Sequence, residues 1–249
     1  MKIINKLNYW LNSSKFKPVA RYFKEKNNIR HLNSRYNFYK KFLEKDDLVF
    51  DIGANIGNRT EIFLKLGCRV IAIEPQEECI LQMKDKFKNN PNVILVNKAV
   101  DKVVHEKEIL LCNVNSVSSM SKEWISKVKE GRYKGFKWKE SRNVPTTTLN
   151  ECIRDYGLPK FCKIDVEGYE KNALNGLSRP IKYISLEFNP ELLENSLEII
   201  SYLSSLGYVL FNFSKKESMK LSFDDWVDDN KIRSHLENIG TWGDIYAKF

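Results

Sequence analysis

A short apolar segment that contains an acid and runs into two glycines constrains this chain more than any other feature. Residues 48–52 read Leu-Val-Phe-Asp-Ile, and residues 53–57 read Gly-Ala-Asn-Ile-Gly. The β-branched apolar run is typical of a buried parallel strand, and the apolar spacing that starts near Arg59 predicts a helix. Glycines in such a turn let backbone N–H groups approach a ligand at the helix N-terminus. The segment therefore predicts a strand–turn–helix unit that binds a small molecule.

A second acid lies where a nucleoside-binding βαβ unit needs one. Residues 69–73 form another strand-like apolar run, and Glu74 follows it directly, 23 positions after Asp51. In such a unit the carboxylate at this place accepts hydrogen bonds from the two ribose hydroxyls. We therefore expect Glu74 to contact a ribose.

The spacing of the glycines argues against a dinucleotide cofactor and hence against an oxidoreductase. The glycines follow the pattern Gly-x-x-x-Gly, and Asp51, in the strand before them, would repel a pyrophosphate. The same acid would attract a ligand that carries an α-amino group and a sulfonium. S-adenosylmethionine has both groups and a ribose for Glu74, so these residues predict it as the cofactor. The alternative is an ordinary βα turn that uses glycine only for its backbone geometry.

The size and composition indicate one globular catalytic unit. A chain of 249 residues can bury one sizeable core, and 42% of its residues are apolar. The apolar runs are too short to span a bilayer, and the start of the chain lacks the pattern of a signal peptide. The five cysteines are scattered without a Cys-x-x-Cys pair, which favours a reducing environment over disulfides or zinc. We therefore expect a cytoplasmic protein.

The net charge of +9 is distributed unevenly. Residues 1–47 hold 12 Lys and Arg against 4 Asp and Glu, whereas the other 202 residues hold 29 against 28. A second basic cluster lies at 122–142, with eight basic residues against three acids. Such clusters suit an anionic acceptor, nucleic acid or an anionic membrane surface, and a solvated face is the alternative.

The first 45 residues have a helical pattern and lie outside the alternation of strands and helices. Ile3, Leu7, Trp10 and Leu11 share one helical face, next to Lys2 and Lys6. We expect this N-terminal helical extension, residues 1–45, to pack on the catalytic domain or on a second subunit of a homodimer. Association with a membrane surface is the less favoured alternative. The catalytic domain would then comprise residues 46–249.

From Leu48 onward the pattern predicts one mostly parallel sheet with helices on both faces, a three-layer α/β sandwich. The predicted strands are 48–52, 69–74, 93–98, 161–165, 182–188, 208–213 and 242–248. The predicted helices are 59–66, 77–89, 148–156, 170–177, 195–206 and a weaker helical region within 223–238. Residues 104–113 predict an added hairpin strand.

A polar, basic segment at 113–145 interrupts this alternation. It contains Trp124, Tyr133, Phe136 and Trp138 among its charged residues. Irregular insertions of this length usually serve as lids or binding loops. Because the segment precedes the strand at 161–165, it could fold over the carboxyl edge of the sheet. We interpret it as a substrate lid, with a surface loop of no function as the alternative.

Carboxylates gather at the carboxyl ends of two neighbouring strands. Asp165 ends the strand at 161–165, Glu167 lies in the turn that follows, and Glu187 lies near the end of the next strand. Two such carboxylates could orient a hydroxyl and take its proton, or hold a divalent metal through oxygen ligands. Only two hard ligands are evident, so no metal is predicted. We interpret Asp165 as the base and Glu187 as the group that orients the hydroxyl.

Five segments together resemble the FkbM family of S-adenosylmethionine-dependent methyltransferases, in the family's order from about residue 47 to 188. They are Val49–Gly57, Glu74-Pro75, Asn97–Val100, Val144–Leu149 and Lys163–Glu170, of which the last is the most specific. The resemblance implies a class I methyltransferase fold with a seven-stranded sheet, and O-methylation, often of sugars in glycans or secondary metabolites.

The resemblance also implies roles for individual residues. Asp51, Gly53, Asn55 and Gly57 would hold the methionine portion of the cofactor, and Glu74 would hold the ribose. The adenine would be bordered by Asn97 and Ala99. The reaction edge would carry Asp165, which also borders the cofactor, and Glu167. Asn150 departs from the family, which usually has Asp after Thr-Leu.

Three functions fit these observations. Methyl transfer to a sugar hydroxyl, in a glycan, a glycolipid or a sugar nucleotide, is the leading hypothesis. Nucleic-acid methylation is less favoured, because Asp165-Val166-Glu167-Gly168 replaces the Asn/Asp-Pro-Pro-aromatic motif of amino-methyltransferases, and Asn189-Pro190 lacks the second proline. A non-catalytic S-adenosylmethionine-binding module is disfavoured by the intact acids at 51, 74, 165 and 187.

Overall fold

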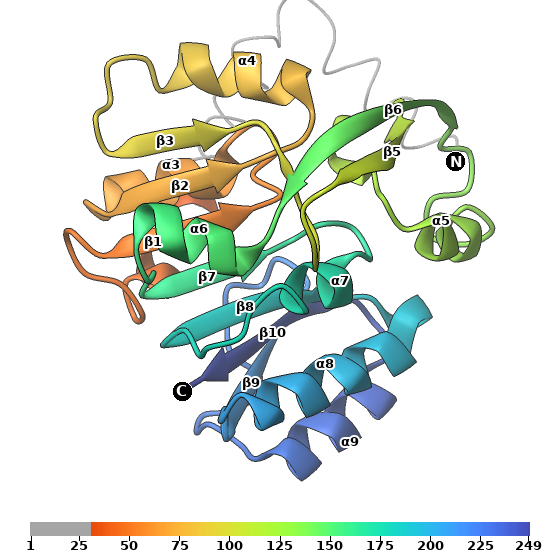
Figure 1. Ribbon diagram of the computed structural model, residues 1–249. Coiled ribbons are helices and arrows are strands. Elements are labelled where there is room, and N and C mark those ends of the chain that lie inside the picture. Colours follow the sequence, from red (N-terminus) through yellow and green to blue (C-terminus); the bar gives the residue numbers. More distant parts are fainter. Residues whose placement is uncertain (1–30) are drawn as a thin grey trace, which may run out of the picture.

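The computed structural model describes residues 31–249, which form a three-layer α/β sandwich around a seven-stranded sheet (Figure 1). The strand order is β3-β2-β1-β7-β8-β10-β9. Only β10 pairs antiparallel with its neighbours, so the sheet is mostly parallel, as predicted. The strands are β1 (Leu48–Ile52), β2 (Arg69–Ile73), β3 (Val93–Val96), β7 (Phe161–Ile164), β8 (Tyr183–Phe188), β9 (Leu210–Lys215) and β10 (Gly243–Lys248).

The order of the strands creates a crevice at one edge. From β1 the chain moves outward to β2 and β3, and it later returns to place β7 on the other side of β1. In open α/β sheets a ligand binds beyond the carboxyl ends of the strands at such a reversal. The fold therefore places the turns after β1 and β7 side by side at the expected ligand edge.

Two apolar clusters separate the three layers. Alternate residues of β1 point to opposite faces, so Phe50 belongs to one cluster and Val49 to the other. The first cluster contains side chains of α6 (Leu149–Tyr156), α7 (Glu170–Leu174), α8 (Leu193–Ser205) and α9 (Asp229–Ile239). The second contains side chains of α3 (Asn58–Lys65), α4 (Glu77–Lys86) and the helical segment that begins at residue 31. Burial of these faces against the sheet stabilises the sandwich.

The described part of the predicted N-terminal extension packs on the sheet. Residues 31–39 are helical, and Phe38 and Phe42 are buried. The ring of Phe42 stacks on Tyr246 of β10, with centroids 5.7 Å apart. Packing on the domain was the first of the predicted alternatives for this segment. The apolar stripe of Ile3, Leu7, Trp10 and Leu11 lies outside the described residues.

A second, three-stranded sheet has the order β4-β6-β5 and lies beside the ligand edge (Figure 1). It consists of β4 (Ala99–Val100), β5 (Glu106–Cys112) and β6 (Trp138–Thr147). The predicted hairpin strand at 104–113 is confirmed by β5. The expectation that 113–145 is irregular is wrong, because this segment contains the 3₁₀ turn η1 (Asn115–Val117), the helix α5 (Lys122–Val128) and most of β6.

The other predicted elements are present with shifted ends. The predicted strand 93–98 ends at Val96, because the amide of Asn97 turns to donate hydrogen bonds to the carbonyls of Glu74 and Pro75, both at 3.0 Å. The helix predicted at 170–177 ends at Leu174, and the weak region in 223–238 becomes α9. Within residues 31–249, no helix has the length and apolar character needed to cross a bilayer.

Candidate active site

The glycine loop after β1 packs directly against the turn after β7. Gly53 has φ +76°, and a Cβ atom there would lie 1.9 Å from the carbonyl oxygen of Asp165. Only glycine can occupy this position, because of both its φ and this contact. Gly57 also has φ +76°, and a Cβ there would meet the ring of Phe87 at 2.5 Å. Gly53 thus shapes the ligand edge, whereas Gly57 allows α3 to pack closely on its neighbour.

Glu74 organises the glycine loop after β1. Its side chain is buried, with 3% exposed, and accepts hydrogen bonds from the backbone N–H groups of Asn55 and Gln76, both at 2.9 Å. The amide of Gln76 donates a further bond at 3.2 Å. Burial raises the pKa of Glu74, and these donors oppose the rise. The residue therefore ties β2 to the loop after β1 with its carboxylate at the ligand edge.

A cleft opens beside Glu74. Its walls come from the glycine loop, from the segment after β2 and from η1 and the residues after it. They include Gly53, Asn55, Glu74 and Ala99, all of which the sequence predicted. Further lining residues, which the sequence did not indicate, are Gln76, Val100, Ile109, Asn115, Ser118 and Met120.

The side chain of Asn97 does not line this cleft; it fixes the turn after Glu74 through the two bonds to backbone carbonyls. Gly57 does not line it either. Asp51 lines a second, adjacent cleft. It is 2% exposed and accepts a hydrogen bond of 2.6 Å from Thr60, while burial raises the pKa of the Asp51 carboxyl. The predicted cofactor residues therefore divide into cleft walls and residues that support them.

The second cleft meets the first at Asp165 and Glu167, which line both. Its walls combine acids with three cations and two aromatic rings. They include Arg35, Asp51, Arg59, Tyr133, Lys163, Glu187, Glu217, Trp242 and Asp244. One cleft thus runs along the predicted nucleoside site, and the other extends from the same point toward β8 and β10.

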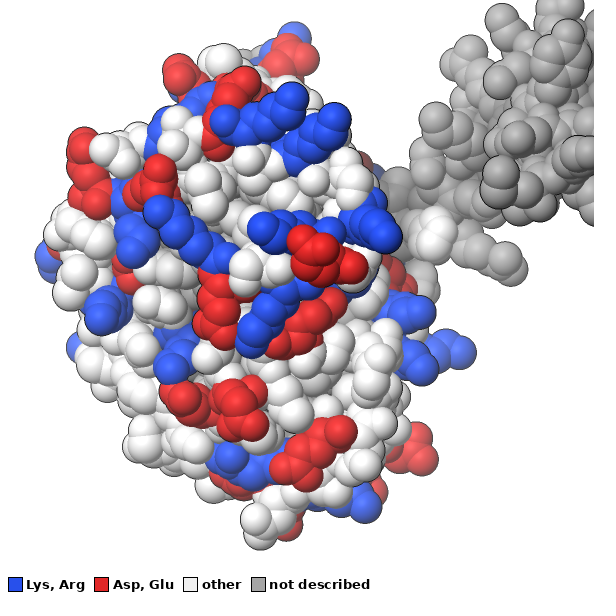
Figure 2. All heavy atoms as spheres, turned by 90° about the vertical axis from the view of Figure 1, so that its right-hand side faces the viewer, with Lys and Arg blue, Asp and Glu red and all other residues white. Residues whose placement is uncertain are grey.

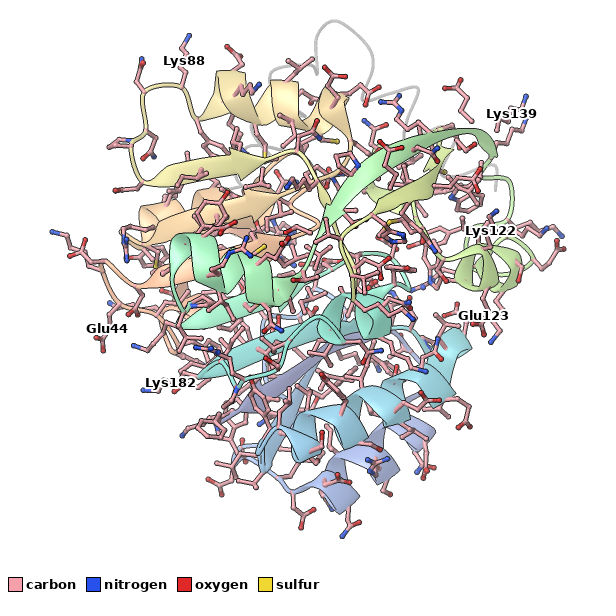
Figure 3. The ribbon with its side chains drawn as sticks, in the orientation of Figure 1. Glu44, Lys88, Lys122, Glu123, Lys139 and Lys182 are labelled. Carbon is pink, nitrogen blue, oxygen red and sulfur yellow. The ribbon has the colours of Figure 1, made fainter. Side chains whose placement is uncertain are left out.

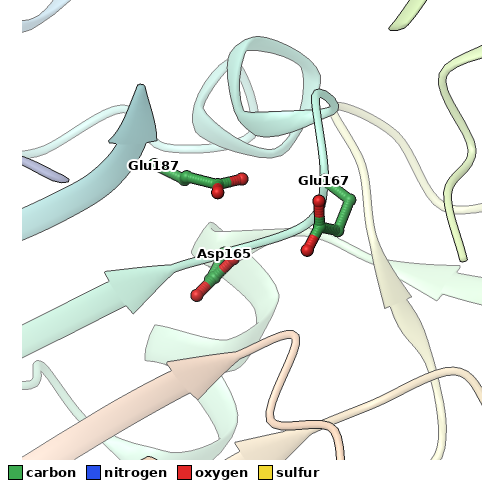
Figure 4. Close-up of side chains that lie close together, drawn as sticks. All are labelled: Asp165, Glu167 and Glu187. Carbon is green, nitrogen blue, oxygen red and sulfur yellow. The ribbon is translucent and has the colours of Figure 1, made fainter. Parts of the chain in front are cut away.

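Three carboxylates converge where the clefts meet. Oxygen atoms of Asp165, Glu167 and Glu187 all lie within 4.8 Å of one another (Figure 4). Glu167 reaches the other two because its backbone has φ +52°, a left-handed conformation that few residues other than glycine adopt. The sequence predicted all three acids at the reaction edge, and the structure brings their carboxylates together.

The cluster carries more negative charge than its surroundings balance. Burial, followed by the charges of Asp165 and Glu170, raises the pKa of Glu167 well above its usual range. Burial and the charges of Glu167 and Asp165 raise the pKa of Glu187 in the same way. Oε2 of Glu167 is buried and has no hydrogen-bond partner among the described residues. Such an arrangement favours the uptake of a proton or of another positive charge.

Lys163 supplies positive charge to one side of the cluster. Its ammonium lies 3.1 Å from Asp165 Oδ2 and 3.1 Å from Asp244 Oδ1, and its side chain is 1% exposed. Burial acts to lower the pKa of Lys163, but the two carboxylates outweigh it and hold the pKa well above its usual range. Lys163 was missed in the sequence, although it lies two positions before Asp165 in a strand and so faces the same side. Asp244 could not be paired with it from the sequence, because β10 is remote along the chain.

Three carboxylates at this spacing could also hold a divalent cation through oxygen ligands. Lys163 already balances one of them, which reduces the charge available to such an ion. The donor set therefore suits two roles, shared protons or a metal, and both use the same oxygen atoms.

The predicted lid folds against the acidic turn. A Cβ atom at Gly168 would lie 2.4 Å from the ring of Trp124, so α5 packs on the turn that carries Glu167. Trp124 is fully buried and contacts Tyr133 and Trp138, with ring centroids 5.7 and 6.4 Å apart. Trp124 therefore belongs to a small core within the segment. Tyr133 does line the second cleft.

The basic cluster at 122–142 is partly neutralised by acids. Lys122 pairs with Glu108 at 2.7 Å and Arg142 with Glu78 at 2.7 Å. On this face of the molecule, Lys and Arg side chains alternate with Asp and Glu rather than forming one positive patch (Figure 2). Lys122 and Lys139 project outward from the segment (Figure 3). Lys139 lines a separate hollow, together with Gln76 and Asn115 of the first cleft.

A seven-stranded sheet of this order, a glycine loop after β1 and an acid after β2 define a class I S-adenosylmethionine-dependent methyltransferase. The model of the methyltransferase FkbM domain matches residues 51–210, and the chain belongs to this family. S-adenosylmethionine is therefore the cofactor. The match confirms the predicted family and fold class.

Similar proteins include other methyltransferases. Ribosomal RNA small subunit methyltransferase A of Thermotoga neapolitana is 34% identical over 92 residues, which are 37% of this chain and 35% of that protein. The chain thus spans about a third of the length of this relative.

Among solved structures, precorrin-6y C5,15-methyltransferase of Geobacter metallireducens has a TM-score of 0.46 at 16% identity, covering 86% of this chain and 88% of that one. A putative methyltransferase of Streptococcus mutans, in complex with SAH, has a TM-score of 0.46 at 11% identity, covering 86% and 95%.

Proposed function

We propose that the protein is an O-methyltransferase that transfers the methyl group of S-adenosylmethionine to a hydroxyl of a carbohydrate-containing acceptor. The observation that carries the proposal is the carboxylate cluster at the point where the two clefts meet. The nucleoside would occupy the first cleft, with its ribose on Glu74, and the acceptor would enter the second. The methyl group would then face the acceptor beside Asp165, Glu167 and Glu187.

The reaction needs alignment and an acceptor for one proton. The hydroxyl oxygen attacks the methyl carbon while the bond from that carbon to sulfur breaks, and sulfur keeps the electron pair as S-adenosylhomocysteine forms. The proton of the hydroxyl passes to a carboxylate of the cluster. Alignment of oxygen and methyl carbon at contact distance supplies most of the acceleration, and general base catalysis adds to it.

The charges favour Glu187 as the base. A carboxylate whose pKa lies nearer to the working pH is a better proton acceptor, and repulsion within the cluster together with burial raises the pKa of Glu187. Asp165 is paired with the Lys163 ammonium, which holds its carboxylate in place beside the cluster. We therefore assign the proton to Glu187 and the orientation of the hydroxyl to Asp165, the reverse of the order that the sequence favoured.

The composition of the second cleft favours a sugar. Several carboxylates converge there, and each can accept hydrogen bonds from neighbouring hydroxyls. Tyr133 and Trp242 add aromatic surface with polar edges, which suits a sugar ring. In this proposal the sugar belongs to a glycan, a glycolipid or a sugar nucleotide.

Nucleic-acid methylation is the second candidate function. It is supported by the similarity to a relative named as a ribosomal RNA methyltransferase. A nucleic-acid backbone, however, requires unpaired Lys and Arg near the reaction point. Acids surround that point here, and ion pairs neutralise Lys122 and Arg142 of the nearby basic cluster. The charge of the second cleft therefore favours a neutral hydroxyl at the reaction point.

The test is to incubate the protein with methyl-labelled S-adenosylmethionine and separate panels of nucleotide sugars, glycolipids, glycans and RNA. Label in a sugar hydroxyl supports the proposal. Label in RNA, with none in the sugar panels, would contradict the proposal and support nucleic-acid methylation. Binding of S-adenosylmethionine without transfer to any panel would leave only a cofactor-binding protein.

A further inference from the structure

Arg59 is a buried cation in which one terminal nitrogen binds a carboxylate and the other has no partner among the described residues. It is the second residue of α3, directly after the glycine loop, and its side chain is 11% exposed. Its Nη2 contacts both carboxylate oxygens of Glu217 at 2.6 Å. Its Nη1 is buried without a hydrogen-bond partner in the part of the chain that the structure describes. A buried guanidinium donor left unpaired is costly, so Arg59 keeps the capacity to bind a further acceptor.

The cofactor has a group that needs such a donor. The methionine portion of S-adenosylmethionine carries an α-carboxylate as well as an α-ammonium and a sulfonium. The acids of the second cleft suit the two cationic groups but repel the carboxylate. Arg59 lines the same cleft as Asp51 and Asn55, which belong to the predicted site for the methionine portion.

The other two cations of the cleft are less suited to this role. Lys163 is held between Asp165 and Asp244 at 3.1 Å each. Arg35 comes from the segment before β1, and its side chain is 24% exposed, so water already solvates its guanidinium. The first backbone N–H groups of α3 add positive potential next to Arg59, since Gly57 provides no side-chain cap.

We propose that Arg59 binds the α-carboxylate of S-adenosylmethionine through its guanidinium, while Glu217 holds Nη2 in place. The ammonium of the methionine then faces Asp51, and the sulfonium points toward Asp165. Arg59 thus sets the position of the methyl group along the line to the acceptor. The proposal rests on the cofactor that the family establishes and not on the identity of the acceptor.

The test compares S-adenosylmethionine with decarboxylated S-adenosylmethionine, which keeps the ammonium and the sulfonium but lacks the carboxylate. Calorimetry measures the binding of both to the wild type and to Arg59→Gln. We expect Arg59→Gln to weaken the binding of S-adenosylmethionine by about tenfold to a hundredfold, the range for a lost hydrogen bond to a charged group. Binding of the decarboxylated compound should be unchanged or tighter, so the preference of the wild type for the carboxylate disappears.

Two further variants separate a direct contact from an effect on the fold. Arg59→Lys keeps the charge but not the planar fork, and it should lose less affinity than Arg59→Gln. Glu217→Gln leaves Arg59 charged and should preserve the preference for the carboxylate. The proposal would be overturned if Arg59→Gln lost affinity equally for both ligands, or lost affinity for neither. Failure of the wild type to bind S-adenosylmethionine would instead contradict the cofactor itself.

Discussion

The backbone N–H of Asn55 donates a 2.9 Å hydrogen bond to Oε2 of Glu74. This bond joins the glycine loop after β1 to the acid after β2, so the two halves of the cofactor site are mechanically linked. Glu74 therefore holds the glycine loop in place, and we propose that it also offers a carboxylate to the ribose.

Replacing Glu74 tests both roles. Glu74→Ala should weaken binding of S-adenosylhomocysteine by about 1.5–3 kcal/mol, because hydrogen bonds to a charged carboxylate are lost. Glu74→Gln can still accept the bond from Asn55 and should lose less affinity. Calorimetry on both variants checks this order. Unchanged affinity in Glu74→Ala would show that the ribose lies elsewhere.

The assignment of the base predicts a difference between two variants. Glu187→Gln should lower turnover by about two to four orders of magnitude, the usual loss for a general base, whereas Asp165→Asn should lower it less and raise the KM of the acceptor. Because the pKa of Glu187 is raised, turnover of the wild type should increase with pH through that pKa, and this dependence should vanish in Glu187→Gln. Steady-state kinetics from pH 5 to 9 measure both effects. A larger loss in Asp165→Asn would return the role of base to Asp165.

Glu170 should make the stability of the fold depend on pH. Its Oε1 accepts hydrogen bonds from the backbone N–H groups of Val166 and Gly168, yet burial raises its pKa to about 7. A carboxyl whose folded pKa exceeds its unfolded pKa binds more protons when folded, so its contribution is complete below about pH 4.5 and is lost as pH rises to about 7.

Glu170→Gln removes this titration but keeps an acceptor for the two N–H groups. Its stability relative to the wild type should therefore increase by about 1–3 kcal/mol between pH 4.5 and pH 7 and stay constant above. Chemical unfolding at several pH values measures it, with Glu237→Gln on α9 as the exposed control. A stability difference that does not change with pH would show that folding does not shift the pKa of Glu170.

The lid segment should affect the acceptor and not the cofactor. Charge reversal of Lys134, Lys137 and Lys139 should raise the KM of an anionic acceptor, because Lys137 and Lys139 line a hollow that shares Gln76 and Asn115 with the first cleft, and favourable pairing becomes repulsion. Binding of S-adenosylhomocysteine should not change. Charge reversal of Lys45, Lys88 and Lys182, three exposed lysines outside the segment, is the control matched for net charge. If neither constant changed, the segment would have no part in acceptor binding.

The sequence determined the βαβ frame, because local patterns report local structure. The apolar runs at 48–52, 69–73 and 161–164 are strands, and the glycines at 53 and 57 adopt the left-handed conformation for which glycine is suited. The spacing of Asp51 and Glu74 placed two acids at the cofactor edge, since parallel strands end at the same edge of their sheet.

Only the tertiary structure decided how charges pair across the site. Glu167 joins Asp165 and Glu187 because its turn is left-handed, and Lys163 meets Asp244 because β10 inserts between β8 and β9. Arg59 meets Glu217 across 158 positions of sequence. Contacts of such separation leave no local pattern, because nothing between the two residues fixes their distance until the sheet has formed. Short sequence segments thus determine the backbone frame of the site, whereas its charge pairs depend on how distant segments pack together.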